Sequence, residues 1–308
     1  MLLATVRPHE VCSHYIVVFF MGGFAMKLDP KFNGRYVEGA GGAKLFVEET
    51  GDASKPTILW LHGYCQSRLS WDRQFENEAL ASQFHMVRLD LRGHGLSDKL
   101  SDVAAFQESK HWADDIHAVI TALNLKKPVL AGWSYGGFII CDYIRFYGQD
   151  NLGGIILVAG VTEMGRDEAN SMLGAEFLGL VPGFFSTDYA EGSTALQQFI
   201  GMVTYEELDP HTFYFLMGLN AVTLPASRKG MFTRELDNRE LMKTITVPTL
   251  IVQGNNDRVV LPAYAEFIAR HIPHASRANY HNCGHVPFVE AAERFNQDVT
   301  AFMQAVQR

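Results

Sequence analysis

The sequence is poor in cysteine and has no excess of basic residues. Its 308 residues include four cysteines, Cys12, Cys65, Cys141 and Cys283, whose spacing forms no disulfide framework. We therefore expect reduced thiols and a cytoplasmic location. The formal net charge is −8 and no basic run occurs, which argues against nucleic acid or an anionic membrane surface as a partner.

Motifs that bind metals or nucleotides are also missing. The sequence contains no Cys-x-x-Cys, His-Glu-x-x-His or P-loop pattern. Gly39, Gly41 and Gly42 lie between short extended runs rather than before a helix, so they predict a hairpin turn and no dinucleotide site. We expect no metal and no cofactor.

A long apolar run occurs near the N-terminus. Residues Tyr15–Met26 are uncharged and apolar, but the stretch is too short to cross a bilayer as a helix, so no stable membrane insertion is expected. We interpret residues 1–30 as an extension that is disordered, that precedes a true start at Met21 or Met26, or that acts as an export signal.

The rest of the chain has the length and composition of one α/β domain, residues 31–308. An apolar content of 47% is ample for a core. Strand-like and helical runs alternate, except between Val161 and about Arg239. We interpret residues 161–239 as a helical lid inserted into a mostly parallel, twisted sheet that is flanked by helices.

A strand, a tight turn and a helix surround Ser134. The pentapeptide Gly-Trp-Ser-Tyr-Gly at 132–136 follows an apolar strand at 128–131 and precedes a helix at 138–147. In a nucleophile elbow the turn strains the serine backbone, and the flanking glycines avoid clashes. Because the pattern also marks ordinary turns, a role for Ser134 depends on partners elsewhere in the chain.

Two downstream residues are suited to activate Ser134. A serine hydroxyl needs a histidine base, and the base needs a carboxylate that fixes its tautomer. Asp257 and His285 follow in the order Ser, Asp, His, each just past a predicted strand, at 247–254 and 276–280. Residues at the carboxyl ends of parallel strands emerge at one edge of the sheet, so the three are expected together.

Both assignments have rivals in the sequence. His281 still belongs to the end of a strand, whereas His285 lies in a loop flanked by glycine and proline that leads to a final helix at about 290–306. Glu163 also follows a buried strand. We favour His285 as the base and Asp257 as the acid.

Hydrolysis also needs donors for an oxyanion. The strand predicted at 57–61 ends in His62-Gly63, so the backbone N–H of Tyr64 can point into the same cleft. The second donor is the backbone N–H of Tyr135, directly after Ser134 and at a helix N-terminus that favours negative charge. By itself, His62-Gly63 would be interpreted as a simple strand-ending turn.

Taken together and in this order, these motifs resemble the α/β-hydrolase superfamily, in particular its small esterase and cofactor-free haloperoxidase-like branch. The matching segments lie at 61–64, 89–98, 132–136, 254–257 and 283–285. The resemblance implies an α/β-hydrolase fold with Ser134 as nucleophile, Asp257 as acid, His285 as base, and Tyr64 and Tyr135 as oxyanion donors. It implies hydrolysis of small carboxylic esters or lactones, with perhydrolase or haloperoxidase activity as a side reaction.

Departures from related families narrow this resemblance. A serine at the elbow argues against haloalkane dehalogenases and epoxide hydrolases, which use aspartate there. Cys65 gives a His-Gly-x-Cys pattern similar to that of plant methylesterases and hydroxynitrile lyases. A lyase of the hydroxynitrile type and a ligand-binding or signalling protein on the same fold therefore stand as alternatives.

The loop at 89–98 contains residues that resemble a metal set. Asp90, His94 and Asp98 could supply ligands, but the glycine spacing and the family resemblance favour a structural loop whose side chains bind backbone groups. We predict no metal there.

The predicted lid is rich in aromatic residues. Most of them are expected to pack the lid against the main domain, and a few to line an apolar acyl or aryl pocket. The candidates for this pocket are Trp133, Cys65, Phe184 and Phe213. Together with the charge balance, they predict a small, uncharged or weakly charged ester-type substrate.

Overall fold

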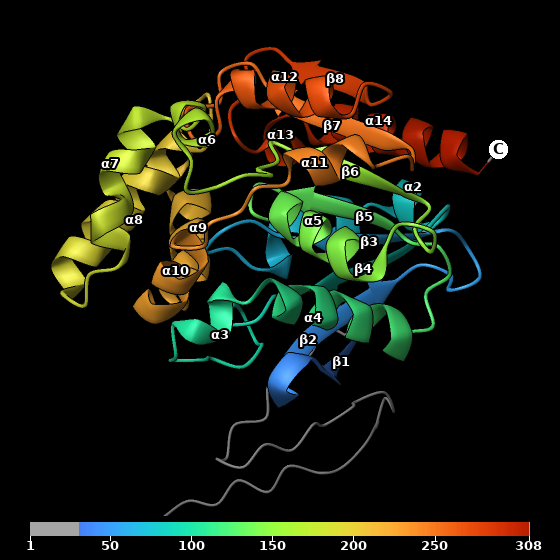
Figure 1. Ribbon diagram of the computed structural model, residues 1–308, viewed down its shortest axis with the longest axis horizontal. Coiled ribbons are helices and arrows are strands. Elements are labelled where there is room, and N and C mark those ends of the chain that lie inside the picture. Colours follow the sequence, from blue (N-terminus) through green and yellow to red (C-terminus); the bar gives the residue numbers. More distant parts are fainter. Residues whose placement is uncertain (1–30, 308) are drawn as a thin grey trace, which may run out of the picture.

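The computed structural model describes residues 31–307. The expectations for the N-terminal extension, 1–30, and for Cys12 lie outside the described residues. The centre is an eight-stranded sheet with the order β1-β2-β4-β3-β5-β6-β7-β8 (Figure 1). β2 runs antiparallel to β1 and β4, and the other neighbours are parallel, so the predicted mostly parallel sheet is confirmed.

From β3 onward, strands and helices alternate along the chain. The strands are β1 (Asn33–Glu38), β2 (Lys44–Thr50), β3 (Thr57–Leu61), β4 (His85–Leu89), β5 (Val129–Trp133), β6 (Gly154–Val158), β7 (Thr249–Gly254) and β8 (Ser276–Tyr280). The main helices around them are α1 (Asp72–Phe75), α2 (Glu78–Ala81), α3 (Ala104–Gln107), α4 (Ser109–Ala122), α5 (Gly136–Tyr147), α12 (Pro262–His271), α13 (Pro287–Glu290) and α14 (Ala292–Val306).

The central strands are buried on both faces, which explains their continuous apolar sequences. Successive side chains of a strand point to opposite faces. In β3, Trp60 packs on Trp71 and on Phe295 of α14, with ring centroids 4.7 and 6.3 Å apart. Its neighbour Leu61 faces the start of α5, where a Cβ added at Gly136 would lie 3.4 Å from the Leu61 Cβ. Helices therefore cover both faces of the sheet.

A helical insertion separates β6 from β7. It consists of α6 (Asp167–Ser171), α7 (Ala175–Phe184), α8 (Tyr189–Met202), α9 (Pro210–Ala221) and α10 (Pro225–Phe232), followed by α11 (Arg239–Lys243). Figure 1 shows α7 to α10 gathered beside the sheet rather than on either of its faces. None of the helices within residues 31–307 combines the length and apolar character that crossing a bilayer requires.

Two local predictions are confirmed. The glycine-rich segment forms a turn, Ala40–Gly42, that joins the antiparallel strands β1 and β2. The final helix predicted at about 290–306 is confirmed as α14, which begins at Ala292; Ala291, with φ −130° and ψ 46°, separates it from the short helix α13.

Candidate active site

The two central strands end at the point where the strand order diverges. β3 and β5 are neighbours, with Leu61 opposite Gly132. From β3 the chain continues to β4 on one side, whereas the later strands follow β5 on the other. Ligand sites of open α/β sheets form beyond the carboxyl ends of strands at such a point. His62-Gly63 and Ser134 follow these two strands directly.

Ser134 lies on a strained turn between β5 and α5. Its φ is 52°, in the left-handed region that a residue with a side chain seldom adopts. A Cβ added at Gly132 would lie 2.6 Å from the Gly136 carbonyl oxygen, and one at Gly137 would lie 2.6 Å from the Val161 carbonyl oxygen. Glycines are therefore required where β5 and α5 approach each other, as the elbow pattern predicts.

His285 and Asp257 form a buried hydrogen-bonded pair. His285 Nδ1 lies 2.8 Å from Asp257 Oδ2, and the residues are 1% and 3% exposed. The other carboxylate oxygen of Asp257 accepts hydrogen bonds from the backbone N–H groups of Val259 (2.8 Å) and Val260 (2.9 Å). Because an ionised carboxylate only accepts, His285 carries its proton on Nδ1, which leaves Nε2 as an acceptor.

The rivals of these two residues lie elsewhere. His281 is exposed, and its Nδ1 lies 3.1 Å from the Asn255 side-chain amide. Glu163 is buried, and its carboxylate lies 3.3 Å from the Arg239 guanidinium. Burial and the nearby Asp237 raise the pKa of Glu163 to about 7. Asp257, rather than Glu163, therefore contacts His285.

The turn after β3 approaches Ser134 closely. A Cβ added at Gly63 would lie 3.3 Å from the Ser134 Cβ. Leu91 N–H donates to His62 Nε2 at 3.0 Å, so His62 Nδ1 carries the proton and donates to the Gly63 carbonyl at 2.8 Å. Burial lowers the pKa of His62 to about 3, which keeps the imidazole neutral. A neutral, buried histidine thus fixes the shape of the turn.

The two predicted oxyanion donors flank this approach. Within residues 31–307, neither the Tyr64 N–H nor the Tyr135 N–H donates a hydrogen bond to a backbone carbonyl. The side chains of both residues bind α10: Tyr64 Oη donates to the Arg228 carbonyl at 3.1 Å, and Tyr135 Oη donates to the Met231 carbonyl at 3.3 Å. Sequence reasoning missed this attachment, because the contacts span about 100 residues or more.

The four predicted pocket residues take different positions. Trp133 contacts His285, because its Nε1–H donates to the His285 carbonyl at 2.9 Å. Cys65 is buried in the turn after β3 with φ 60°, and burial raises the pKa of its thiol to about 12. Phe184 is buried with its ring centroid 6.0 Å from that of Tyr64.

Phe213 lies on the outer part of the insertion. It is half-buried on α9 and helps to line a groove of about 560 Å³. The other lining residues belong to the α8–α9 region or are Arg258, and Ser134 is not among them. Phe213 therefore contributes to a surface feature of the insertion, whereas Phe184 packs directly on the turn after β3.

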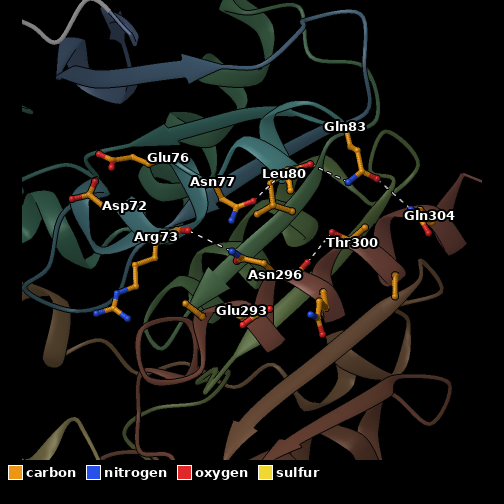
Figure 2. Close-up of a pocket in the computed structure, with 14 residues that line it drawn as sticks. Asp72, Arg73, Glu76, Asn77, Leu80, Gln83, Glu293, Asn296, Thr300 and Gln304 are labelled. Carbon is orange, nitrogen blue, oxygen red and sulfur yellow. Dashed lines mark hydrogen bonds between the residues drawn. The ribbon is translucent and has the colours of Figure 1, made fainter.

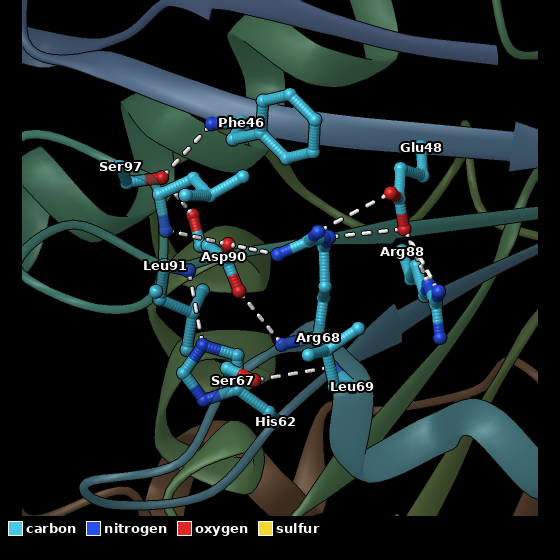
Figure 3. Close-up of polar contacts among 12 residues, drawn as sticks. Phe46, Glu48, His62, Ser67, Arg68, Leu69, Arg88, Asp90, Leu91 and Ser97 are labelled. Carbon is cyan, nitrogen blue, oxygen red and sulfur yellow. Dashed lines mark hydrogen bonds and ion pairs between the residues drawn. The ribbon is translucent and has the colours of Figure 1, made fainter. Parts of the chain in front are cut away.

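A buried ionic network lies behind the turn after β3 (Figure 3). Arg68 contacts Asp90 at 2.6 Å and Glu48 at 3.2 Å, and Arg88 donates to the same Glu48 at 2.9 Å. Asp90 also accepts from the Leu96 N–H at 2.8 Å. The carboxylates are satisfied by guanidinium and backbone groups, as expected of a structural loop. Within residues 31–307, no cluster of three or more potential ligands could hold a metal ion.

A larger groove of about 890 Å³ lies between α1–α2 and α14 (Figure 2). Most of the residues that line it are of polar types, among them Asn77, Asn296 and Gln304. Asn296 turns its side-chain oxygen toward the buried Gln74, which donates to it at 3.0 Å. None of the predicted catalytic residues lines this groove, so it is separate from the site at Ser134.

Comparison with known proteins agrees with this geometry. The family model described as the alpha/beta hydrolase fold matches residues 56–292, more than half of the chain. This chain is an α/β hydrolase. The predicted family and fold class are therefore confirmed.

Individual α/β hydrolases are similar over nearly the whole described domain. A bifunctional esterase/perhydrolase of Acinetobacter calcoaceticus is 27% identical over 88% of this chain and 99% of its own. An esterase from Rhodococcus sp. ECU1013 has a TM-score of 0.82 and 30% identity, and a putative aryl esterase from Burkholderia cenocepacia has 0.83 and 28%. Each structural match covers 89% of this chain and 99% of the other. These likenesses support a carboxylic ester hydrolase.

Proposed function

We propose that this α/β hydrolase cleaves small carboxylic esters or lactones through an acyl-enzyme on Ser134. The observation that carries the proposal is the buried hydrogen bond between His285 Nδ1 and Asp257, on the same sheet edge as the strained elbow. That bond leaves the His285 Nε2 lone pair as the base. His285 takes the proton of the Ser134 hydroxyl as its oxygen attacks the carbonyl carbon.

The oxyanion that forms accepts hydrogen bonds from the backbone N–H groups of Tyr64 and Tyr135. His285 then gives the proton to the leaving alcohol, the carbonyl re-forms, and Ser134 carries the acyl group. Water attacks the acyl carbon and His285 accepts its proton. The bond between the acyl carbon and the Ser134 oxygen then breaks, His285 returns the proton to that oxygen, and the carboxylic acid leaves. Losing one such donor typically costs a factor of about 10²–10³ in rate.

The helical insertion acts as a lid in this proposal and supplies the apolar side of the pocket. Phe184 and Cys65 border the turn that carries the Tyr64 amide, and neither bears a charge. A small, uncharged or weakly charged ester suits such surroundings. Perhydrolase activity is proposed as a side reaction, supported by likeness to the Acinetobacter calcoaceticus enzyme.

Ser134→Ala tests the proposal with a short-chain aryl ester as substrate. The expected loss of kcat is on the order of a millionfold if the three residues act as a unit. An aryl phosphonate should label wild-type enzyme at Ser134, as a mass increase on the peptide that contains it. Near-normal ester turnover by the variant would contradict the proposal, and cyanohydrin cleavage without an acyl-enzyme would identify a lyase instead.

A further inference from the structure

The loop that carries His285 is held by the helical insertion. The His285 N–H donates to the carbonyl of Val203, just past the end of α8, at 2.7 Å. A Cβ added at Gly284 would lie 2.7 Å from that carbonyl oxygen and 2.9 Å from the Tyr205 nitrogen. The main chains of the two segments are thus in direct contact, and only glycine fits at position 284.

A single carboxylate joins the same two segments. Glu290, the last residue of α13, accepts a hydrogen bond from the Gly284 N–H at 2.7 Å through one oxygen. Its other oxygen accepts from the Tyr205 N–H at 2.6 Å. The Cys283 thiol donates to the first oxygen at 3.4 Å. Hydrogen bonds to a charged acceptor are about twice as strong as neutral ones, so this bridge is a firm attachment.

The backbone of His285 is therefore fixed from two directions. Its carbonyl accepts from Trp133 in the sheet, and its N–H binds the insertion at Val203. Glu290 closes the second attachment by linking Gly284, the residue before the base, to Tyr205. Without the carboxylate, two backbone N–H groups lose their acceptor, and the bond between the His285 N–H and the Val203 carbonyl is left to hold the loop against the insertion.

We propose that Glu290 is a positioning residue that holds His285 in register with Ser134 by tying the base loop to the segment Val203–Tyr205. The inference rests on the proposed function, because it assigns His285 as the base. Under this proposal the helical insertion helps to position His285 in addition to acting as a lid. A misplacement of about 1 Å at a catalytic group can cost on the order of a hundredfold in rate.

The test compares Glu290→Ala and Glu290→Gln with Glu293→Ala, an exposed glutamate three residues further on. For a short-chain aryl ester, Glu290→Ala should lower kcat by about tenfold to a hundredfold, with KM within about twofold. Glu290→Gln keeps one acceptor oxygen in nearly the same volume, so it should fold and lose less. Glu293→Ala should match the wild type.

A spectroscopic readout separates positioning from mere stability. The His285 Nδ1 proton, which is shared with Asp257, should give a far-downfield NMR resonance that shifts or broadens in both Glu290 variants. If kcat, the pH dependence of kcat/KM and this resonance all match those of Glu293→Ala, the inference is overturned, even where the melting temperature falls. Ester hydrolysis that survives Ser134→Ala would instead refute the proposed function, so the two failures are distinguishable.

Discussion

Replacement of Asp257 by asparagine tests the base–acid pair with little change in volume. One oxygen of Asp257 accepts from the N–H groups of Val259 and Val260, and an asparagine oxygen can keep both bonds. The asparagine NH₂ then occupies the place of the second oxygen, which faces His285 Nδ1 at 2.8 Å. Two donors would oppose each other there, so the imidazole must move its proton to Nε2.

A proton on Nε2 removes the acceptor that Ser134 needs in the proposed mechanism. In serine hydrolases with a Ser-His-Asp triad, the wrong histidine tautomer lowers kcat by a factor of about 10⁴, which corresponds to about 5.5 kcal/mol of transition-state stabilisation. The free energy of unfolding should fall by less than this. Gln253 Nε2 also donates to the second oxygen at 3.1 Å, but the Gly254 and Val260 carbonyls hold it in place. The opposed donors should cost about 1–3 kcal/mol of unfolding free energy.

The assay measures kcat/KM for a short-chain aryl ester between pH 5 and 9, together with urea unfolding. Asp150→Asn, at an exposed aspartate, is the control and should be unchanged in both. A value of kcat/KM within tenfold of wild type for Asp257→Asn would refute the reasoning. In that case Glu163→Gln in the same background decides whether the second buried acid supports the base.

Two further predictions concern stability. Gly132→Ala places a Cβ 2.6 Å from the backbone carbonyl of Gly136, so it should lower the free energy of unfolding in urea by about 1–3 kcal/mol and also lower activity. Gly218→Ala adds its Cβ in open space and should do neither. Equal stability of the two variants would contradict the close approach. Glu163 has a pKa raised from 4.5 to about 7, so its contribution to stability is complete below pH 4.5 and is lost as pH rises to about 7. Glu163→Gln stays neutral, so its free energy of unfolding in urea, relative to that of the wild type, should rise between pH 5 and pH 8 by at most about 3 kcal/mol. If the stability difference between variant and wild type is the same at both pH values, the raised pKa is contradicted.

The sequence was most informative where burial on two faces produces an unbroken apolar run. β3 has the predicted bounds, and β5 and β7 differ by at most two residues at either end. The short helix α13 before Ala291 was not predicted, because its four residues are too few to show a helical period. Glu290 turns its carboxylate to Gly284 and Tyr205, and only the folded chain brings those groups together.

The candidate site residues could be predicted from their residue types and their order along the chain, whereas the hydrogen bonds that hold them in place could not. The positions of Asp257 and His285 can be predicted because each follows a strand and a short loop. The strand pattern and the glycines of the loop both lie within a few residues of each side chain. The attachment of Tyr64 and Tyr135 to α10 joins residues 164 and 96 positions apart, respectively, and no local pattern encodes it. Long-range hydrogen bonds depend on the packing of the insertion, which has no strand–helix alternation to guide a prediction.

The turn after β3, Asp257 and the loop of His285 are therefore each held in place by a different part of the fold. The neutral His62 and the loop at Leu91 fix the oxyanion turn, and backbone N–H groups fix Asp257. The insertion reaches both sides: α10 binds the Tyr64 and Tyr135 side chains, and the segment after α8 binds the base loop. Sequence changes on the outer faces of α7 and α9 can alter the pocket and surface without touching these attachments. Under the proposed function, we therefore expect changes in the segment after α8 or in α10 to alter kcat, and changes on the outer faces of α7 and α9 to alter the substrate range.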